Sequence, residues 1–459
     1  MGRLNNIFFL LLLALCAGCS GVKNLTRPDV QSPEAFSGQP LDTVTIADIG
    51  WWEFYGDEYL KTIIEKVLEE NKQMLIAAER VEQARYLYNV EKASLLPELS
   101  FRLPWNHETN SYYKELKLID PEIGVKASIT WEIDLFGALR WNKKKALSQF
   151  RASEFDLRAM RMLLVAETAT AYFRLVALDN ELEIVRSTMV TREEGVRLAK
   201  LRFDGGLTSE TVYQQAQVQY ATAAALIPNI EYNIKVAENR LLLLMGELPD
   251  QKVARSSYLK DNTLPDRVPL GIPSSLLERR PDIQASEQKL QAAVANVGYT
   301  FARRFPSLNI ELTGGVEDND FKNLFRSPFS YVAENFVAPL FDFGKRKNRY
   351  KAAVAAYNEA RLSYESKVLE AFGEVDNART RYRSARMAVT KDTELLDAAA
   401  KYQELTWKQY RGGTINYIDV LDAQRRFFEA QVARMNAIRD EHFALIQLYK
   451  ALGGGWTLP

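Results

Sequence analysis

The sequence is poor in the residues that carry metal and redox chemistry. Of 459 residues only two are histidine and two are cysteine, and both cysteines lie before residue 20. His107 and His442 stand far apart in the chain, so a histidine metal cluster or a catalytic triad has little support. Phosphate-binding loops and nucleophile elbows are also lacking, and no cofactor is expected. These absences argue against an enzyme.

The sequence also lacks an excess of charge of either sign and a long apolar run. Lysine plus arginine and aspartate plus glutamate number 59 each, so bulk charge favours neither nucleic acid nor an anionic surface as a partner. Beyond the first twenty residues there is no stretch of about 18 uncharged apolar residues, the length that a membrane helix needs. The apolar content of 47% is nevertheless ample for a folded core.

The N-terminus has the pattern of a secretory signal. An apolar run from Ile7 to Ala17 follows Arg3 and leads into the sequence Cys-Ala-Gly-Cys. This sequence resembles a bacterial lipobox, in which Cys19 becomes the lipidated first residue, although Cys16 stands where leucine is usual. We expect a signal peptide over 1–18 and a lipid-anchored, proline-bearing linker over 19–48, with Ser20 suited to outer-membrane sorting. A plain signal peptide is the alternative.

Two long stretches carry sustained seven-residue apolar repeats. Over 140–204 one row is Leu164, Ala171, Leu178 and Val185, and 345–410 repeats in the same way. Such repeats predict coiled-coil packing of long helices. At 1.5 Å per residue, each unbroken helix would be roughly 90 Å long.

The two long stretches end in similar sequences. The sequence RFDGGLTS at 202–209 matches QYRGGTIN at 409–416, and further similarities keep an offset between 207 and 209. We read a tandem duplication, with a first repeat over 49–250, a linker over 251–271 and a second repeat over 272–459. The glycine pairs at 205–206 and 412–413 are predicted to end the helices in the left-handed conformation. Thr208 or Ser209, and Thr414 or Asn416, would cap the returning helices at about 209–246 and 416–452.

Each repeat also contains two β-like segments, about 98–107 and 123–135, then 306–317 and 328–341. Apolar and polar residues alternate strictly from Val125 to Leu135, whereas the last segment alternates poorly. One interpretation is a soluble sheet covered on one face. The other is a transmembrane β-barrel with apolar side chains outward. Four strands cannot close, so a barrel needs an oligomer: three subunits would give twelve strands, and two or four remain open.

Several motifs together resemble those of a known family. They are WWEFYGDEYL at 51–60, WEIDLFGALR at 131–140, IPSSLLERRPDI at 272–283, ARRFPSLNIELTGG at 302–315, PLFDFGKRK at 339–347, INYIDVLDAQR at 415–425 and YKALGGGW at 449–456. The pattern is similar to that of TolC-like outer-membrane channels, more narrowly the NodT-type efflux lipoproteins. The resemblance covers nearly the whole chain after residue 19.

The resemblance implies a mixed α+β membrane protein in the outer membrane. The expected assembly is a homotrimer with a twelve-stranded transmembrane β-barrel, continued by a long periplasmic α-helical coiled-coil barrel. A periplasmic adaptor protein and an inner-membrane pump are the implied partners, with outer-membrane lipid around the barrel and no nucleic acid. The channel would passively conduct drugs, toxic compounds or metal ions.

The resemblance also assigns residues to the two hairpin tips. Tyr410, Asp419 and Asp422 take the places of a gate, while Ile415 replaces a basic residue that some members carry there. The remaining tip residues take the places of an adaptor-docking segment: Gly206, Leu207, Thr208, Ser209, Gly413 and Thr414. The second tip departs from the first by lacking the leucine.

Two further functions stay open. A type I protein-secretion channel uses the same kind of conduit for proteins. A periplasmic scaffold lipoprotein would use the coiled coils alone, but it would not need the amphipathic strand around Ile129 and Trp131.

Overall fold

The computed structural model describes residues 44–112, 116–257, 268–338 and 341–457, together with Leu25, Pro28 and Leu259; the side chains of 106–122 are not considered. Contacts divide the chain into two compact units. As far as they are described, the first comprises Met1–Val30, Glu79–Phe155 and Ile283–Lys367, and the second comprises Gln31–Ala78, Asp156–Asp282 and Val368–Pro459. Each unit therefore draws on both halves of the sequence.

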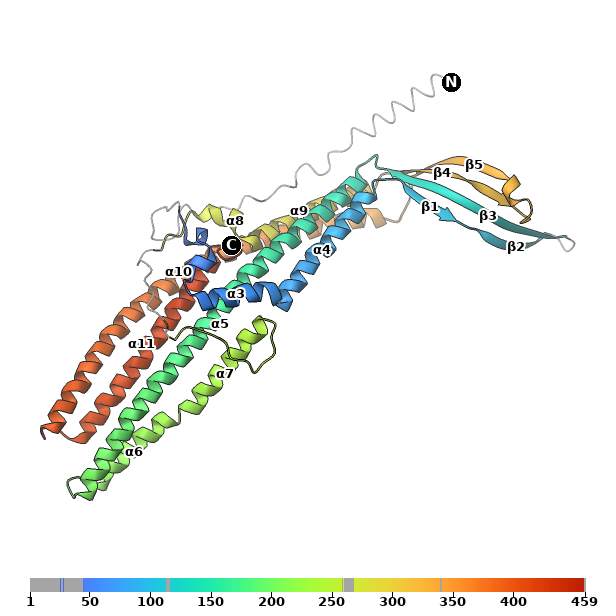
Figure 1. Cartoon of the computed structure of the whole chain (residues 1–459). Helices are drawn as coiled ribbons and strands as arrows, with labels where there is room; N and C mark the ends of the chain where they lie inside the picture. Colours follow the sequence, from blue (N-terminus) through green and yellow to red (C-terminus); the bar gives the residue numbers. More distant parts are fainter. Residues whose placement is uncertain are drawn as a thin grey trace. The chain divides into compact units, whose positions relative to one another are not determined.

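An antiparallel sheet lies in the first unit (Figure 1). Its strands are β1 (Glu98–Arg102), β2 (Trp105–Tyr112), β3 (Leu116–Ile133), β4 (Ser307–Asp318) and β5 (Pro328–Val337). β1 and β2 pair with β3 in one register, and the interruption between them falls at Pro104, which has no N–H for the ladder. The sheet is thus four strands wide, with β1/β2 and β5 at its edges.

The strand ends differ from those expected. Pairing of β2 with β3 continues to Tyr112 and Leu116, past the expected ends at 107 and 123, while β5 stops at Val337. The expectation followed apolar alternation, which fades in the polar sequence NHETNSY. Backbone hydrogen bonds need no such alternation, so the hairpin extends further than the pattern does.

The register places the apolar residues of three strands on one face. Leu99 lies opposite Ile129, which lies opposite Leu312 on the next strand. Because a slip by one residue would turn a strand's apolar set to the other face, this agreement confirms the face predicted from alternation. The other face is polar: there the Lys126 ammonium lies 2.9 Å from a Glu317 carboxylate oxygen.

The last strand mixes the two faces. Its pairing with β4 puts Glu334 beside Ile310 on the apolar face, together with Val332 and Phe336. Phe329 and Tyr331 lie on the polar face, with their rings stacked at a centroid distance of 6.3 Å. The weak alternation in the sequence therefore reflects a strand, β5, that places apolar residues on both faces of the sheet.

The helices account for most of the chain outside the sheet. They are α2 (Trp51–Phe54), α3 (Glu58–Glu70), α4 (Lys72–Ala93), α5 (Ala138–Asp204), α6 (Glu210–Ala224), α7 (Ile227–Leu244), α8 (Leu276–Arg279), α9 (Pro281–Ala302), α10 (Lys345–Arg411) and α11 (Tyr417–Ala451). The two expected long helices are present as α5 and α10, each 67 residues long. Each extends about 100 Å at 1.5 Å per residue. In the described ranges no helix has the length and apolar character to cross a membrane.

The first returning helix is broken, contrary to the expectation of one helix over 209–246. α6 ends at Ala224 and α7 begins at Ile227, with Pro228 in its first turn. Proline has no N–H to bond to the carbonyl four residues earlier, and its ring crowds that carbonyl. The break therefore falls just before Pro228, whereas α11 continues without interruption from Tyr417 to Ala451.

The main core lies in the second unit, where α3 packs against α5, α7 and α11. The rings of Phe54 and Tyr449 stack at 4.1 Å, and the Tyr449 hydroxyl donates to the Ile49 carbonyl at 2.6 Å. Trp51, Leu60 and Tyr172 are almost completely buried in the same core. The residues around Trp51 are thus held by α11, near the C-terminal end of the described chain.

Two of the family-like motifs meet beside this core. Arg280 of LLERRPDI is 3% exposed, and its guanidinium contacts Asp282 and Glu374, each at 2.7 Å. It also donates to the Ala451 carbonyl of YKALGGGW at 3.2 Å. At Gly454 a Cβ atom would lie 2.5 Å from the Tyr449 ring, so a side chain does not fit there. These motifs are structural anchors.

Candidate functional site

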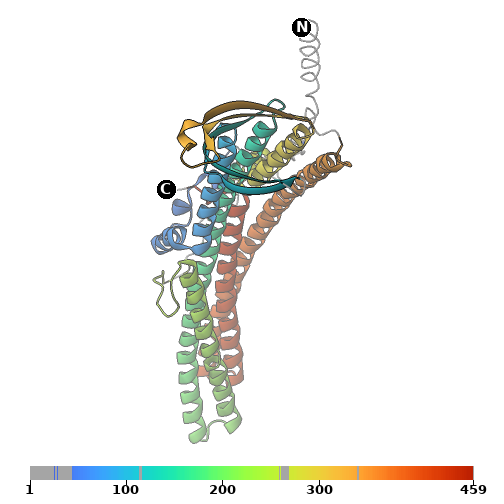
Figure 2. The ribbon, with the colours of Figure 1, turned by 90° about the vertical axis from the view of Figure 1, so that its right-hand side faces the viewer.

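The two hairpin tips belong to the second unit and close in the same way (Figure 2). At the end of α5, Gly206 has φ +72° and donates to the Phe203 carbonyl, while Leu207 donates to Arg202. At the end of α10, Gly413 has φ +76° and the corresponding bonds run from Gly413 to Tyr410 and from Thr414 to Gln409. Both are Schellman caps, as the glycine pairs predicted.

The returning helices begin differently from each other. Ser209 is the N-cap of α6, but its side chain makes no capping hydrogen bond. Asn416 is the N-cap of α11, while the Thr414 hydroxyl donates backwards to the Gln409 carbonyl at 3.0 Å. Among the described residues, a side-chain bond at the start of the returning helix is seen at the second tip, where it comes from Asp419.

Asp419 is exposed and serves that cap. Its Oδ2 accepts the backbone N–H of Asn416 at 3.1 Å, the reciprocal half of a capping box. A carboxylate in the first turn of a helix is also favoured by the helix dipole. Asp419 thus has a structural task at the start of α11.

Asp422 is balanced by two arginines on its own helix. Its carboxylate lies 2.7 Å from the Arg425 guanidinium and 2.8 Å from that of Arg426. The hydrogen bonds from Arg426 and Arg425 lower the pKa of Asp422 below its usual range. The carboxylate is therefore ionised at neutral pH, but the group of three carries a net positive charge.

Tyr410 lies in a small aromatic cluster that joins the two hairpins. Its ring centroid is 5.2 Å from that of Tyr417 and 6.0 Å from that of Trp407. From the first hairpin, the Arg202 guanidinium lies 4.9 Å from the Tyr410 ring centroid. Such a cation–π contact stabilises by roughly 0.5–1 kcal/mol at an exposed site.

Tyr417 is the buried centre of this cluster. It is 4% exposed, and its hydroxyl has no hydrogen-bond partner among the described residues. Burial, with a smaller contribution from Tyr410, raises the pKa of Tyr417 to about 12. A Cβ atom on Gly195 of α5 would lie 2.6 Å from this hydroxyl, so the glycine makes room for it.

Arg202, Gly195 and Tyr417 complete the cluster but were not among the residues expected from sequence. The one available signal was Gly195, an isolated glycine inside a long helix, which usually has a packing reason. The partner across the two hairpins could not be read from heptad spacing, because spacing gives a helix face without its neighbour.

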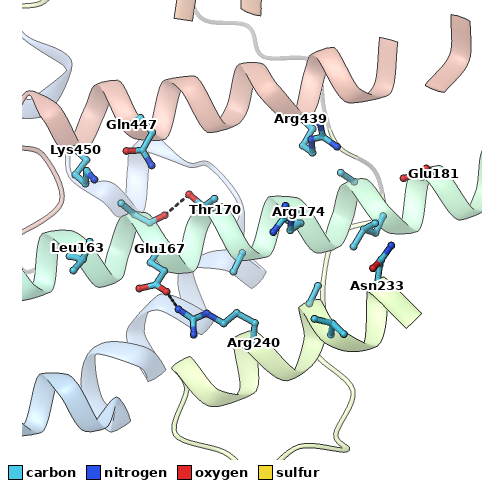
Figure 3. Close-up of a pocket in the computed structure, with 16 residues that line it drawn as sticks. Leu163, Glu167, Thr170, Arg174, Glu181, Asn233, Arg240, Arg439, Gln447 and Lys450 are labelled. Atoms are coloured by element: carbon cyan, nitrogen blue, oxygen red, sulfur yellow. Dashed lines mark hydrogen bonds and ion pairs between the residues drawn. The ribbon is translucent and has the colours of Figure 1, made fainter. Parts of the chain in front are cut away.

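A groove of about 770 Å³ lies in the same unit, farther from the tips, between α5, α7 and α11 (Figure 3). Its charged lining residues are Arg174, Arg240, Arg439, Lys450, Glu167 and Glu181. Glu167 is paired with Arg240, and burial raises the pKa of Glu181. Cations outnumber carboxylates in this groove.

Histidine, cysteine and carboxylate side chains are dispersed over the described part of the chain. No site there brings three or more histidine, cysteine, aspartate or glutamate side chains together for an ion. The His442 ring packs on Phe173 at 4.5 Å, in the helical core. Cys19 lies outside the described residues.

An amphipathic sheet joined to long paired helices that end in closed tips fits the outer-membrane channel subunits that the sequence motifs resemble. The protein family described as "Outer membrane efflux protein" matches this chain over residues 63–247 and 272–454. The chain belongs to this family and is an outer-membrane efflux protein.

The named relatives are also outer-membrane proteins. The chain is 30% identical over 465 residues to the solvent efflux pump outer membrane protein SrpC of Pseudomonas putida, covering 97% of each chain. It is 29% identical to SilC of Salmonella typhimurium, a probable outer membrane lipoprotein, covering 96% of this chain and 97% of SilC. The open-state structure of the Neisseria gonorrhoeae outer membrane channel MtrE matches with a TM-score of 0.82 and 26% identity, covering 94% of this chain and 97% of MtrE. SrpC is named as part of an efflux pump and MtrE as a channel, and none of the three names is that of an enzyme.

Proposed function

We propose that three copies of this chain form the outer-membrane channel of a tripartite efflux system. One observation carries the proposal: the register gives β1, β3 and β4 one apolar and one polar face, and among the described residues β1/β2 and β5 each pair on one side only. In lipid an open edge leaves backbone groups unpaired, so the sheet must close with other copies. Three copies give twelve strands, and the polar faces then line an aqueous path.

The stoichiometry is tested by native mass spectrometry of the detergent-purified protein. The expected mass is three chains, and the same preparation should conduct ions in planar bilayers. A mass of two or four chains would contradict the trimer. A protein that stays soluble without detergent would contradict the membrane-spanning sheet itself.

An efflux role places an adaptor and an inner-membrane pump beside the channel, and the cargo is a small molecule or ion. The relatives support this choice over protein secretion, since SrpC is named for solvent efflux. A scaffold role would leave the apolar sheet face without a purpose. Co-expression with the adaptor and pump encoded nearby should restore solvent or drug tolerance to a strain that lacks its own channel.

The two halves of the chain are proposed to come from a tandem duplication. The family matches begin 209 residues apart and end 207 residues apart, and the starts of α5 and α10 are separated by the same interval as their ends. The identical Schellman caps support the same origin. A superposition of the two halves that failed to align the helices and tips together would count against it.

The first tip is proposed to dock the adaptor. Leu207 is 72% exposed at the point of the turn, flanked by Gly206, Thr208 and Ser209. The second tip, with Gly413 and Thr414, offers no such side chain. Leu207→Glu should weaken adaptor binding, whereas Thr414→Glu should weaken it less; equal effects would contradict the assignment.

Tyr410, Asp419 and Asp422 are proposed to form the gate at the second tip. The support is that Tyr410 links the two hairpins through Arg202, so outward movement of the second hairpin must break that contact. The exposed Asp419 carboxylates of three copies would form an acidic ring around the axis. Asp422 contributes together with its two arginines.

Cys19 is proposed to carry the lipid anchor. The support is the lipobox-like sequence and the named lipoprotein relative SilC. Cys19→Ser should abolish palmitate labelling of the chain, and labelling that persists would contradict the assignment.

A further inference from the structure

The strand-to-helix junctions of the first unit are dense in positive charge. The sequence RWNKKK at 140–145 opens α5, and KRKNRYK at 345–351 opens α10, with no carboxylate in either segment. The cations concerned are Arg140, Lys143, Lys144, Lys145, Lys345, Arg346, Lys347, Arg349 and Lys351. This is a local concentration within a chain whose net charge is zero.

Some of these cations have partners within the chain. Arg140 pairs with Asp134 at 3.1 Å, and Arg346 pairs with Asp342 at 3.7 Å. The Lys144 ammonium lies 5.1 Å from the Trp141 ring centroid.

Several others are left without a carboxylate, four of which are considered together below. Within the described part of the chain, no ion pair forms to Lys143, Lys345, Lys347 or Arg349, and the last three are exposed. We call these four residues the basic collar.

Helix stability does not explain the basic collar. The first turn of a helix carries a partial positive charge, so cations there cost free energy and carboxylates are preferred. Neither α5 nor α10 has an acidic residue in its first turn. Asp134 and Asp342 accept backbone N–H groups at the starts of α5 and α10 and pair with Arg140 and Arg346. Lys345 and Lys347 add two further charges in the first turn of α10, which an anion from outside the chain would compensate.

Exposed aromatic rings stand beside the same cations. Phe341 and Phe343, which directly precede α10, are 79% and 89% exposed, with their rings 4.6 Å apart. Phe343 also has φ +52°, a strained value for a residue other than glycine. Apolar rings next to lysine and arginine are typical of the boundary between lipid and water.

A chain of aromatic contacts brings the two junctions together in this unit. Phe136, before α5, stacks on Phe305 at 4.9 Å, and Phe305 contacts Phe301 at 5.5 Å. Phe301 lies 5.8 Å from Tyr350, inside the basic segment of α10. The apolar face of the sheet ends just before these junctions, because β3 stops at Ile133.

We infer that the basic collar binds the phosphate headgroups of anionic phospholipids at the periplasmic face of the outer membrane, while Phe341 and Phe343 insert among the acyl chains. This inference rests on the proposed function, in which the sheet spans that membrane. Lysine and arginine each gain roughly fivefold in binding beside an anionic lipid surface. The junctions would then fix the depth and orientation of the channel.

The test is retention of lipid by the purified full-length protein. The protein in detergent is given equal amounts of phosphatidylglycerol and phosphatidylethanolamine with identical acyl chains, and retained lipids are counted by native mass spectrometry. Wild type should retain phosphatidylglycerol preferentially. Lys345→Gln, Lys347→Gln and Arg349→Gln combined should lower that preference by at least tenfold.

Two matched variants control the result. Lys345→Arg, Lys347→Arg and Arg349→Lys combined keeps the charges and should keep the preference. Lys391→Gln, Lys401→Gln and Lys408→Gln combined removes the same charge from exposed positions on the far part of α10, and should also keep it.

Each contrary outcome has a distinct meaning. Wild type that forms channels but retains both lipids equally overturns this inference and leaves the proposed function standing. Wild type that does not insert into bilayers overturns the proposed function. Unchanged lipid retention in the glutamine variant, with altered ion selectivity, would place the basic collar in the lumen and overturn the inference.

Discussion

At the scale of single residues, the tip cluster depends on the fit between Gly195 and Tyr417. A methyl group at Gly195 would lie 2.6 Å from the Tyr417 hydroxyl, with the next ring carbon at 3.9 Å. Overpacking of this kind costs about 1–3 kcal/mol, more than the roughly 1 kcal/mol that alanine gains over glycine in a helix. Gly195→Ala should therefore speed hydrogen exchange at the start of α11.

The rescue of that variant separates this contact from a general effect on α5. Tyr417→Phe removes the crowded oxygen and leaves the ring at an ordinary distance. Gly195→Ala combined with Tyr417→Phe should exchange as slowly as Tyr417→Phe alone. Fast exchange in the double variant would show that the clash is not the cause.

Arg202 offers a second test at this scale. Arg202→Ala removes the cation over Tyr410 that joins the two hairpins. Loss of roughly 0.5–1 kcal/mol shifts the balance between closed and open channels by about two- to fivefold. Mean conductance in planar bilayers should rise accordingly.

Lys200 provides the matched control for Arg202. Its ammonium lies 5.5 Å from the Tyr213 ring centroid, a cation–π contact within the first hairpin alone. Lys200→Ala should leave conductance unchanged. An equal rise in both variants would mean that the link between the hairpins is not what holds the channel closed.

At the scale of elements, the buried Arg280 ties α9, α10 and the end of α11 together. Arg280→Ala removes a guanidinium that is 3% exposed from Asp282, Glu374 and the Ala451 carbonyl. Loss of one partner of a buried ion pair costs about 3–5 kcal/mol. The free energy of unfolding, measured by urea denaturation in detergent, should fall by about that amount.

The neighbouring Arg279 supplies the comparison. It pairs with Asp48 at 2.6 Å, but both side chains are partly exposed. Surface ion pairs contribute about 0–1 kcal/mol, so Arg279→Ala should have little effect. If the two variants lost the same stability, burial of Arg280 would not be the reason.

The elements also show how far the sequence determines the fold. Both long helices, both Schellman turns and the shared apolar face of β1, β3 and β4 follow from heptads, glycine pairs and alternation, which are local signals. Pro228 is likewise a local signal for the break between α6 and α7. The ends of β2 and β3 were not predictable from alternation, because backbone pairing there outlasts the apolar pattern.

The site was less predictable than the fold. The repeated glycine pairs located the tips and the resemblance named Tyr410, Asp419 and Asp422, but the tasks of these residues depend on their neighbours. Asp419 caps α11, which the sequence alone leaves undecided between a cap and a gate. Arg202 reaches Tyr410 from 208 positions earlier in the chain, a distance that no local pattern spans.

At the scale of the whole molecule, the proposed acidic ring would be a property of the proposed trimer and not of one chain. Asp419→Asn keeps an oxygen to accept the Asn416 N–H while removing one charge per chain. Exposed charges act on a passing ion by roughly 0.5–1 kcal/mol. The preference for cations over anions should therefore fall by about two- to fivefold, measured as reversal potentials in a salt gradient.

Substitution of an arginine beside Asp422 should change the cation preference in the opposite direction to Asp419→Asn. Arg425→Gln uncovers part of the Asp422 charge, so cation preference should rise. If both variants shifted selectivity in the same direction, or neither did, Asp419 and Asp422 would not lie near the conducting path.

The equal lengths of α5 and α10 restrict how such a protein can change in size. Removing seven residues from one helix alone would withdraw one tip by about 10 Å and separate Arg202 from Tyr410. We therefore expect insertions and deletions in these helices to be tolerated only in matched pairs, one in each half. An engineer who wishes to fit the channel to a wider or narrower gap between two membranes has to edit both hairpins by whole heptads at once.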